Sequence, residues 1–477
     1  MRDVFIVGVY TTRFARYLER SIKDLAGEAV RGVLTDASLD KTALQTVFFS
    51  NSGWGFNGYQ HCIRGQVALR PLGIGDVPIT NVENACAGGS TALHSAWKDV
   101  ASGACDVSLA LGAEKLHQAN KYAVFAGFLA GTDVTEAAAE AERIAATITQ
   151  AEAAGEVASP VSSDRPTTPA PNKRKKTLKE RVLDLRDQAV TGIQLGEAIG
   201  YDELRRIVAF SAGGAGTKGA GKKKGGADHS PFMDIYAFKA RQHMQRYGST
   251  AEQLACIASK NHHHSTFNEN AQYRFEISPE RVLQDRMVAA PLTRAMCAPI
   301  GDGAAATIVM SEDAVRRYGL EQRAVRVRAS VLGSGHARTD DEPDIGERMA
   351  KRAYQQAGLG PDEIDCVELH DATAFGELHQ TEALGFFAKG EGGSAAQRGD
   401  TRLGGRLPIN TSGGLLSRGH PIGASGLAQI HELVTQLRGE AGARQVQHAR
   451  IALAENGGGA LGSEEAAMCI HILERNA

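Results

Sequence analysis

Length, composition and charge set the first limits on this protein. The chain has 477 residues, and its 53 lysines and arginines against 55 aspartates and glutamates leave a formal net charge of −2 at pH 7. This balance argues against a dedicated nucleic-acid-binding protein, and 42% hydrophobic residues exclude global disorder and a fibrous fold. The apolar runs are shorter than the ~18 residues of a transmembrane helix, and we expect a cytoplasmic protein without a signal peptide.

The order of the predicted elements indicates an α/β fold built from two related halves. Residues 22–50 predict a helix, a break and a strand, and residues 346–369 repeat the same order. Residues 77–90 correspond to residues 407–414, since in both a short β-type run leads through small residues toward a helix. A repeat near half the chain length indicates a duplicated domain and not a solenoid.

The segment between Thr132 and Asp228 differs from the rest of the chain. It contains an Ala/Glu-rich stretch, a proline-punctuated Ser/Thr tract and the run 213–226, which is almost entirely Gly, Ala and Lys. The run 213–226 is too poor in apolar residues to fold alone, and we predict that the whole segment is an insertion with two flexible stretches. Its basic clusters fit either solvated loops or contact with an anionic ligand or lipid surface.

Cys86 is the first candidate for chemistry. It follows a β-type run and precedes a helix whose apolar face includes Leu93 and Trp97. Unpaired N–H groups and the macrodipole at a helix N-terminus lower the pKa of a thiol, so Cys86 is predicted to be an ionised nucleophile. A small buried residue is the alternative interpretation. The seven cysteines contain no CxxC pair, so we predict neither a disulfide framework nor a metal site.

Two histidines are predicted at strand-to-helix turns. His370 follows the predicted strand 366–369, and His420 lies in a Gly-rich loop before a predicted helix. A histidine in a loop is often only a surface residue. Polar groups of α/β sites collect at the carboxyl edge of the sheet, which favours a functional pair here.

A glycine-rich stretch, Glu455-Asn456-Gly457-Gly458-Gly459, follows a predicted strand near the C-terminus. The backbone N–H groups of Gly458 and Gly459 predict an oxyanion-binding site with Glu455 beside it, and a tight turn is the alternative. The triplet His262-His263-His264, at the end of a predicted helix, is not expected to bind a metal ion. Adjacent helical side chains point in different directions and do not easily share one ion.

Three motifs together resemble the thiolase superfamily, and most closely its sterol-carrier-protein branch. They are NACAGGS at 84–90, ELHD at 368–371 and GHPIGASG at 419–426. The resemblance covers nearly the whole chain outside the insertion and implies a duplicated, five-layered α-β-α-β-α fold. The implied divisions are an N-terminal half at 1–125 and 235–318, a loop domain with the insertion at 126–234, and a C-terminal half at 319–477.

The resemblance also implies roles and partners. Cys86 would be the acyl-accepting nucleophile, His420 would take its proton, and His370 with His420 would bind the thioester oxygen. Acyl-CoA and coenzyme A would be substrates, with no resident cofactor, and the chain would form a homodimer or a larger assembly. Bacterial and archaeal relatives further suggest a separate partner protein built from an OB-fold and a zinc ribbon.

Two departures from the family pattern concern the second catalytic cysteine. The sterol-carrier branch has it where Ala372 stands, and other thiolases have one that aligns with Glu455; Cys469 lies too far along the terminal strand to substitute. A reversible Claisen reaction needs an acid/base at the enolate carbon. We hypothesise that a desolvated Glu455 with a raised pKa takes this role. The alternative is a structural Glu455, with His370 or water moving the proton.

The expected function is thiolysis of a 3-oxoacyl-CoA, or the reverse condensation, through an acyl-Cys86 intermediate. The setting would be lipid metabolism such as β-oxidation, with branched, aromatic or steroid-derived acyl groups as open as short ones. One alternative is a retro-aldolase acting on a hydroxyacyl-CoA, which needs no covalent nucleophile. Another is a non-catalytic protein that binds acyl-CoA or lipid.

Overall fold

The computed structural model describes residues 2–118, 124, 127–133, 229–339, 341–462 and 464–476. The predicted insertion at 132–228 lies almost wholly outside these residues, as does most of the predicted loop domain. The domain boundaries therefore stay predictions.

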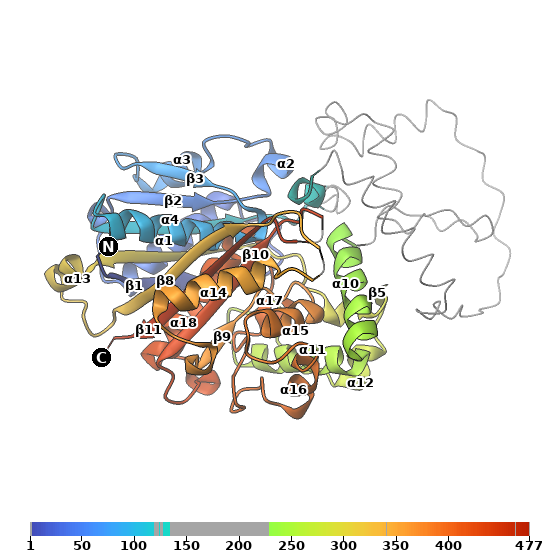
Figure 1. The fold of residues 1–477 in the computed structure, drawn as a ribbon. Coiled ribbons are helices and arrows are strands. Elements are labelled where there is room, and N and C mark those ends of the chain that lie inside the picture. Colours follow the sequence, from blue (N-terminus) through green and yellow to red (C-terminus); the bar gives the residue numbers. More distant parts are fainter. Residues whose placement is uncertain are drawn as a thin grey trace, which may run out of the picture.

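One large mixed sheet organises the described part of the chain (Figure 1). It has nine strands in the order β3-β2-β4-β7-β1-β8-β11-β10-β9, and β5 and β6 form a separate hairpin. The strands are β1 (Val4–Thr11), β2 (Thr46–Ser50), β3 (Ile79–Val82), β4 (Val107–Glu114), β5 (Met287–Ala289), β6 (Leu292–Thr293), β7 (Gly303–Ser311), β8 (Val325–Ser334), β9 (Cys366–Glu368), β10 (Ile451–Gly458) and β11 (Ala467–Arg475).

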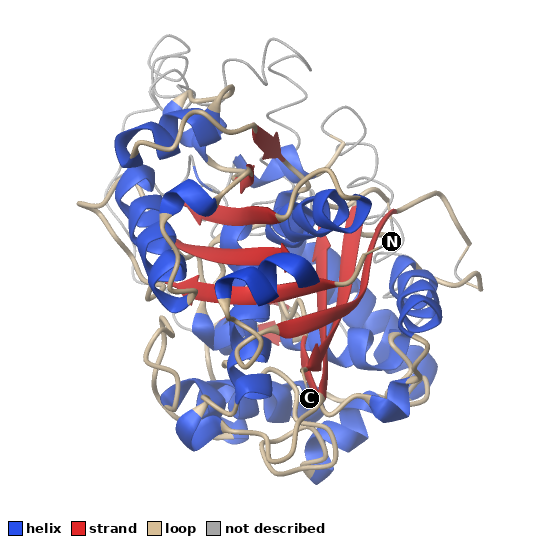
Figure 2. Ribbon diagram, turned by 90° about the vertical axis from the view of Figure 1, so that its left-hand side faces the viewer, coloured by secondary structure: helices blue, strands red, loops and turns tan. Residues whose placement is uncertain are grey.

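Helices lie on both faces of this sheet, as Figure 2 shows, and further helices form a separate cluster with the β5–β6 hairpin. They are α1 (Ile22–Asp36), α2 (Trp54–Gly58), α3 (Arg64–Leu69), α4 (Gly88–Ser102), α10 (Pro231–Tyr247), α11 (Ala251–Thr266), α12 (Pro279–Leu283), α13 (Glu312–Tyr318), α14 (Ile345–Ala357), α15 (Ala374–Ala383), α16 (Gly392–Arg398), α17 (Gly414–Arg418) and α18 (Ser425–Arg438). Among the described residues, none of them combines the length and apolar character that crossing a bilayer requires.

The strand order confirms that the chain contains two related halves. On one side of the β1–β8 junction, β1, β7 and β4 are antiparallel neighbours, and β2 and β3 continue in parallel. On the other side, β8, β11 and β10 are antiparallel, β9 is parallel to β10, and Ile409 bridges to Val367 in parallel. Each half thus repeats the same topology outward from the junction. β1 and β8 pair through Phe5 with Arg326 and Ile6 with Val325.

The predicted helix and strand of each repeat are also present. Capping boxes begin both helices: Ser21 with Asp24 starts α1, and Asp344 with Glu347 starts α14. α1 and α14 then lead to β2 and β9, as the sequence predicts.

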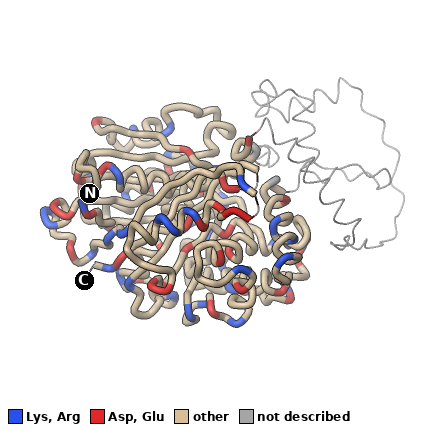
Figure 3. The backbone as a smooth tube through the Cα atoms, viewed as in Figure 1, with Lys and Arg blue, Asp and Glu red and all other residues tan. Residues whose placement is uncertain are grey.

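Three hydrophobic clusters set the layers. α4 and α18 pack between the two halves of the sheet, where Leu93 and Leu433 share one core with strand residues from both halves. α1 and α3 cover the opposite face of the N-terminal half, and α14 covers that of the C-terminal half. Because α4 follows Cys86 and α18 follows His420, this central helical layer brings both residues to the junction of the halves. Charges of both signs are scattered along the chain (Figure 3).

A buried ion pair joins α11 to α15 near the loop that carries His370. Lys260 Nζ lies 2.7 Å from Glu377 Oε1 and donates to the carbonyl of Ile409 at 2.7 Å, and both charged side chains are 1% exposed. Asn261 links the pair to Asp371, whose carboxylate also accepts from the backbone of Leu415. This cluster fixes the loop that carries His370.

We predict that Lys260→Met lowers the free energy of unfolding by about 3–5 kcal/mol, because it leaves the Glu377 carboxylate buried without its charge partner. Chemical denaturation at neutral pH measures this. The control is Arg316→Met, which removes an exposed ion pair with Glu312 and should cost about 0–1 kcal/mol. Equal losses in the two variants would contradict the assignment.

Candidate active site

The backbone of the turn that carries Cys86 is fixed by a strained residue and by close contact with β10. Cys86 lies in a 3-10 turn, Ala85–Ala87, between β3 and α4, and Ala85 adopts φ +46°, a strained value for a residue other than glycine. Gly458 on β10 approaches so closely that a Cβ there would lie 2.4 Å from the Ala87 nitrogen and from the Asn84 oxygen. The C-terminal half therefore fixes the turn that presents the sulfur.

His420 contacts Cys86 directly across the junction of the halves. Its Nε2 lies 3.2 Å from Cys86 Sγ, and its Nδ1 lies 2.7 Å from Ser425 Oγ. Ser425 Oγ donates its proton to the carbonyl of Pro421 at 2.9 Å, so it accepts from His420 Nδ1–H. We infer this tautomer from the hydrogen bonds, and it leaves the Nε2 lone pair facing the thiol. His420 is thus placed to receive the Cys86 proton.

His370 completes the group at the carboxyl end of β9. Its ring centroid lies 5.3 Å from that of His420, and the ligating atoms of Cys86, His370 and His420 all lie within 4.8 Å of one another. Burial lowers the pKa of His370 to about 4, with Glu465 acting in the opposite direction, and burial also lowers the pKa of His420. Both imidazoles are neutral at pH 7, and a neutral imidazole can donate an N–H to a developing oxyanion.

The predicted ionisation of Cys86 is wrong for the resting site. Burial raises the pKa of Cys86 to about 12, and the carboxylates of Glu83 and Glu114 raise it further. The backbone N–H groups of Gly459 and of Cys86 itself act in the opposite direction, but desolvation is the largest effect. In addition, α4 begins at Gly88, beyond the cysteine. Cys86 rests as a thiol and becomes a nucleophile only as its proton passes to His420.

The predicted oxyanion glycines occupy different places. Gly459 lines the cavity in front of Cys86, with its N–H directed at the sulfur. Gly458 lies behind, against the backbone of the Cys86 turn. Gly458 is the last residue of β10, and Gly459 follows directly after the strand.

Glu455 is fully buried and does not line the cavity. Its Oε2 accepts the backbone N–H of His370 at 3.0 Å, and Gln429 donates to its main-chain carbonyl at 2.9 Å. Burial raises the pKa of Glu455 to about 8, with the nearby Glu465 adding to the effect. The raised pKa that the sequence predicts for Glu455 is thus present. Because Glu455 does not line the cavity, it could exchange a proton with a substrate only through another group.

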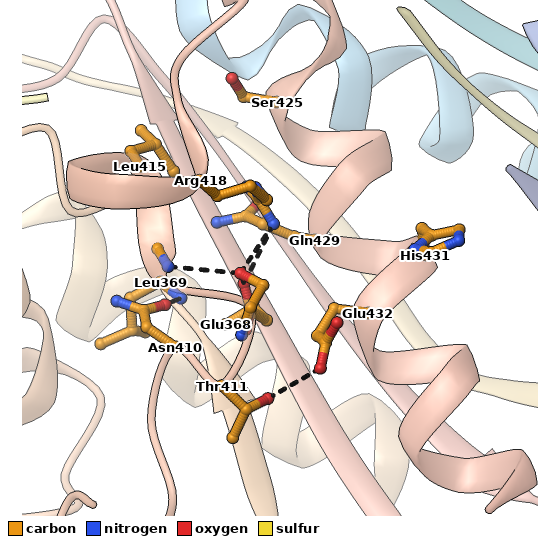
Figure 4. Close-up of polar contacts among 12 residues, drawn as sticks. Glu368, Leu369, Asn410, Thr411, Leu415, Arg418, Ser425, Gln429, His431 and Glu432 are labelled. Carbon is orange, nitrogen blue, oxygen red and sulfur yellow. Dashed lines mark hydrogen bonds and ion pairs between the residues drawn. The ribbon is translucent and has the colours of Figure 1, made fainter. Parts of the chain in front are cut away.

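A buried ion pair ties the two histidine loops together (Figure 4). Arg418, which is 2% exposed, places Nη1 3.2 Å from Glu368 Oε2 and 3.1 Å from Ser412 Oγ. Glu368 and Arg418 stand two residues before His370 and His420, respectively. Burial raises the pKa of Glu368 to about 7 against the opposing effect of Arg418. The pair fixes the separation of the two imidazoles.

A cavity of about 1500 Å³, formed by described residues, opens in front of Cys86. Its wall includes His370, His420 and Ala372, which stands at one place of the missing second cysteine. Aromatic side chains also line it: Phe56, Tyr59, Phe128, Phe232, Tyr236, Tyr273 and Phe275. Basic side chains in the wall are Arg16, Arg64, Arg281, Arg286 and Arg294. The cavity can receive a large ligand with both apolar and anionic parts.

Two further cavity residues, Glu465 and Cys297, were not found from the sequence. Glu465 follows the Gly-rich stretch in a Glu-Glu pair that carries no recognisable motif. Cys297 is brought to the cavity by its bridge to Thr373, but its Sγ donates to the carbonyl of Thr293 and burial raises its pKa to about 12. Cys469 is 0% exposed, lies 3.8 Å from Thr91 Oγ1 and is not a cavity residue, as predicted.

The histidine triplet in α11 points in three directions, as predicted. His262 contacts Ser417, His264 contacts the carbonyl of Asn410, and His263 is exposed beside Glu276. In the part of the chain that the structure describes, Cys86, His370 and His420 are the one group with metal-ligand spacing. Sulfur and imidazole ligands suit zinc, but an ion there would occupy the sulfur and the imidazole that acyl chemistry uses.

Comparisons with known proteins agree with this geometry. A family model described as "Thiolase, N-terminal domain" matches residues 4–159, and one described as "Thiolase C-terminal domain-like" matches residues 336–474. An acetyl-CoA acetyltransferase of Methanothermobacter thermautotrophicus is 33% identical over 100% of both chains. Human sterol carrier protein 2 is 33% identical over 96% of this chain and 70% of its own. The solved structure of the "Ltp2-ChsH2(DUF35) aldolase" superposes with a TM-score of 0.66 at 20% identity, covering 99% of this chain and 98% of that one.

We predict that Gly458→Ala displaces Cys86, because the added Cβ would overlap backbone atoms of the turn. The rate at which iodoacetamide alkylates Cys86, followed by mass spectrometry of the Cys86 peptide, should change at least severalfold. Gly75→Ala is the matched control, since nothing lies within 4 Å of the Cβ it would add. An unchanged rate in Gly458→Ala would contradict the constraint.

We also predict a pH-dependent effect of Glu455→Gln on stability. With a pKa of about 8 instead of 4.5, Glu455 contributes stability that is complete below the lower value and is lost as pH rises toward 8. The advantage of wild type over the variant in unfolding free energy should therefore fall by up to about 1.4 kcal/mol per pH unit across this window. Denaturation of both proteins at matched pH measures the difference. A flat difference would contradict the burial effect.

Proposed function

Because the chain belongs to the thiolase superfamily, in its sterol-carrier-protein-2-like branch, we propose that this acyltransferase cleaves a 3-oxoacyl-CoA with coenzyme A or runs the reverse condensation. The observation that carries the proposal is the 3.2 Å contact between His420 Nε2 and Cys86 Sγ. A thiol beside the free lone pair of an oriented imidazole is the arrangement that nucleophilic catalysis requires.

The geometry supports a two-step transfer. Cys86 loses its proton to His420 as the sulfur adds to the 3-oxo carbon, while N–H donors such as those of His370 and Gly459 stabilise the oxyanion. The bond between C2 and C3 then breaks, which leaves the acyl group on Cys86 and an acyl-CoA enolate. Coenzyme A finally takes the acyl group from the sulfur, and His420 returns the proton to Cys86.

The cavity favours a bulky acyl group. Its volume of about 1500 Å³ exceeds what a short linear chain fills, and its aromatic wall suits a branched, aromatic or steroid-derived substituent. The arginines in the wall provide partners for the phosphates of coenzyme A.

We further propose that the chain works in the cytoplasm as a homodimer or larger assembly. An OB-fold zinc-ribbon partner stays part of this proposal, and the similar Ltp2-ChsH2(DUF35) aldolase supports it, because its name joins two proteins.

We predict that a 3-oxoacyl-CoA leaves an acyl group on the Cys86 peptide, detected by mass spectrometry. Cys86→Ser should reduce thiolysis by a factor on the order of 10³ or more, because the weaker nucleophile cannot form the intermediate efficiently. The exposed Cys62 offers the control, and Cys62→Ser should keep both readouts.

Two outcomes would favour the alternatives. Cleavage of a hydroxyacyl-CoA without an adduct on Cys86 would support the retro-aldolase. A Cys86 no more reactive toward iodoacetamide than Cys105, with no turnover of any 3-oxoacyl-CoA tested, would support a non-catalytic acyl-CoA-binding protein.

A further inference from the structure

Glu464 and Glu465 are neighbours in the chain, but their side chains point in different directions. Glu464 is 2% exposed, and its oxygens lie 2.7 Å from Arg338 Nε and 2.8 Å from Arg348 Nη2. It also accepts the backbone N–H of His336 at 3.0 Å. These contacts anchor the chain just before β11, whereas the next residue, Glu465, faces the cavity in front of Cys86.

The backbone of Glu465 is fixed as well. Gly335, just beyond β8, donates its N–H to the carbonyl of Ala466 at 3.1 Å. A Cβ at Gly335 would lie 2.3 Å from the main-chain oxygen of Glu465, so the two segments are in close contact. The Glu465 side chain therefore leaves a rigid hairpin, which is what a group that must meet a substrate atom needs.

The side chains of Glu465, Glu455 and His370 converge in front of Gly457. A Cβ at that residue would lie 3.1 Å from Glu465 Cγ, 3.4 Å from Glu455 Oε1 and 3.6 Å from His370 Nδ1. The absence of a side chain at Gly457 thus leaves room for two carboxyl groups beside one imidazole. Burial, with the neighbouring Glu465 adding to the effect, raises the pKa of Glu455 to about 8, so Glu455 holds a proton beside Glu465 at neutral pH.

On the basis of the proposed acyl transfer, we propose that Glu465 is the catalytic acid/base that replaces the missing second cysteine, and that Glu455 is a positioning residue behind it. Of the two carboxyl groups, Glu465 lines the cavity and Glu455 does not. The rival sulfur of Cys297 is engaged with the carbonyl of Thr293 and does not belong to the group formed by Cys86, His370 and His420.

Every proton that moves during this reaction has a donor and an acceptor. When the bond between C2 and C3 breaks, its electron pair stays on C2, and the carboxyl group of Glu465 donates its proton there to release an acyl-CoA. The Glu465 carboxylate then takes the thiol proton of incoming coenzyme A, whose sulfur attacks the acyl-Cys86 thioester. The Cys86 sulfur leaves and recovers its proton from the imidazolium of His420. The enzyme returns to its starting state without any further reactant.

Acetyl-CoA in D₂O separates this proposal from the acyl transfer on which it rests. Acetylation of Cys86 at equilibrium, measured by mass spectrometry, reports the acyl transfer alone. Deuterium uptake at C2, measured by NMR, requires the acid/base. We expect Glu465→Gln to retain acetyl-Cys86 within about twofold of wild type and to take up deuterium at least about 10²-fold more slowly.

The matched control is Glu312→Gln, the same substitution at an exposed glutamate of α13 outside the cavity wall, which should keep the wild-type rate of deuterium uptake. Glu465→Asp, which shortens the reach and keeps the carboxylate, should recover part of the uptake. Wild-type uptake in Glu465→Gln, or its loss in Cys297→Ser instead, would overturn the assignment. If wild-type protein neither acetylates Cys86 nor exchanges deuterium, the proposed acyl transfer fails and the role of Glu465 falls with it.

Discussion

The contact between Cys86 and His420 is the constraint on which the site depends. It joins residues 334 positions apart in the chain, and neither half of the fold contains both. Cys86 is placed by β3 and α4, and His420 by the loop before α18, so only the close approach of α4 and α18 between the two half-sheets brings them within 3.2 Å. Chemistry at this site therefore requires the whole duplicated fold, and a disturbance of the central helical layer would disturb it.

Buried ion pairs fix the loops that make this contact, although such pairs are uncommon in a core that serves stability alone. Glu368 with Arg418 and Lys260 with Glu377 lie where apolar side chains would pack without a desolvation cost. Their benefit is geometric, because Glu368 and Arg418 fix the two histidine loops relative to one another and Lys260 ties α11 to α15 and to Ile409. Burial lowers the pKa of both histidines and keeps them neutral, so that His420 can accept the Cys86 proton and His370 can donate to an oxyanion.

The sequence predicts most of the features that depend on neighbouring residues in the chain and few of those that depend on burial. The duplicated α/β units, the turns carrying Cys86, His370 and His420 and the divergent histidine triplet are encoded by nearby residues, and the structure contains them. The ionisation of Cys86 was predicted wrongly, because the helix terminus is visible in the sequence whereas the desolvation that outweighs it arises from long-range packing. Glu465 escaped notice for a related reason: only the anchoring of Glu464 by Arg338 and Arg348, residues more than a hundred positions earlier, turns its neighbour into the cavity.

Burial also bears on the proposed replacement of a second thiol by a carboxyl group. Desolvation raises the pKa of Cys297 and of Cys469 to about 12, far from neutrality, so such a thiol needs additional stabilisation to act as a base. The same effect moves the pKa of Glu455 from 4.5 to about 8, much closer to neutrality. An acid/base is most effective when its pKa lies near the operating pH. Burial therefore brings the pKa of a carboxyl group closer to neutrality than that of a thiol, and the loss of the second cysteine is compatible with retained Claisen chemistry.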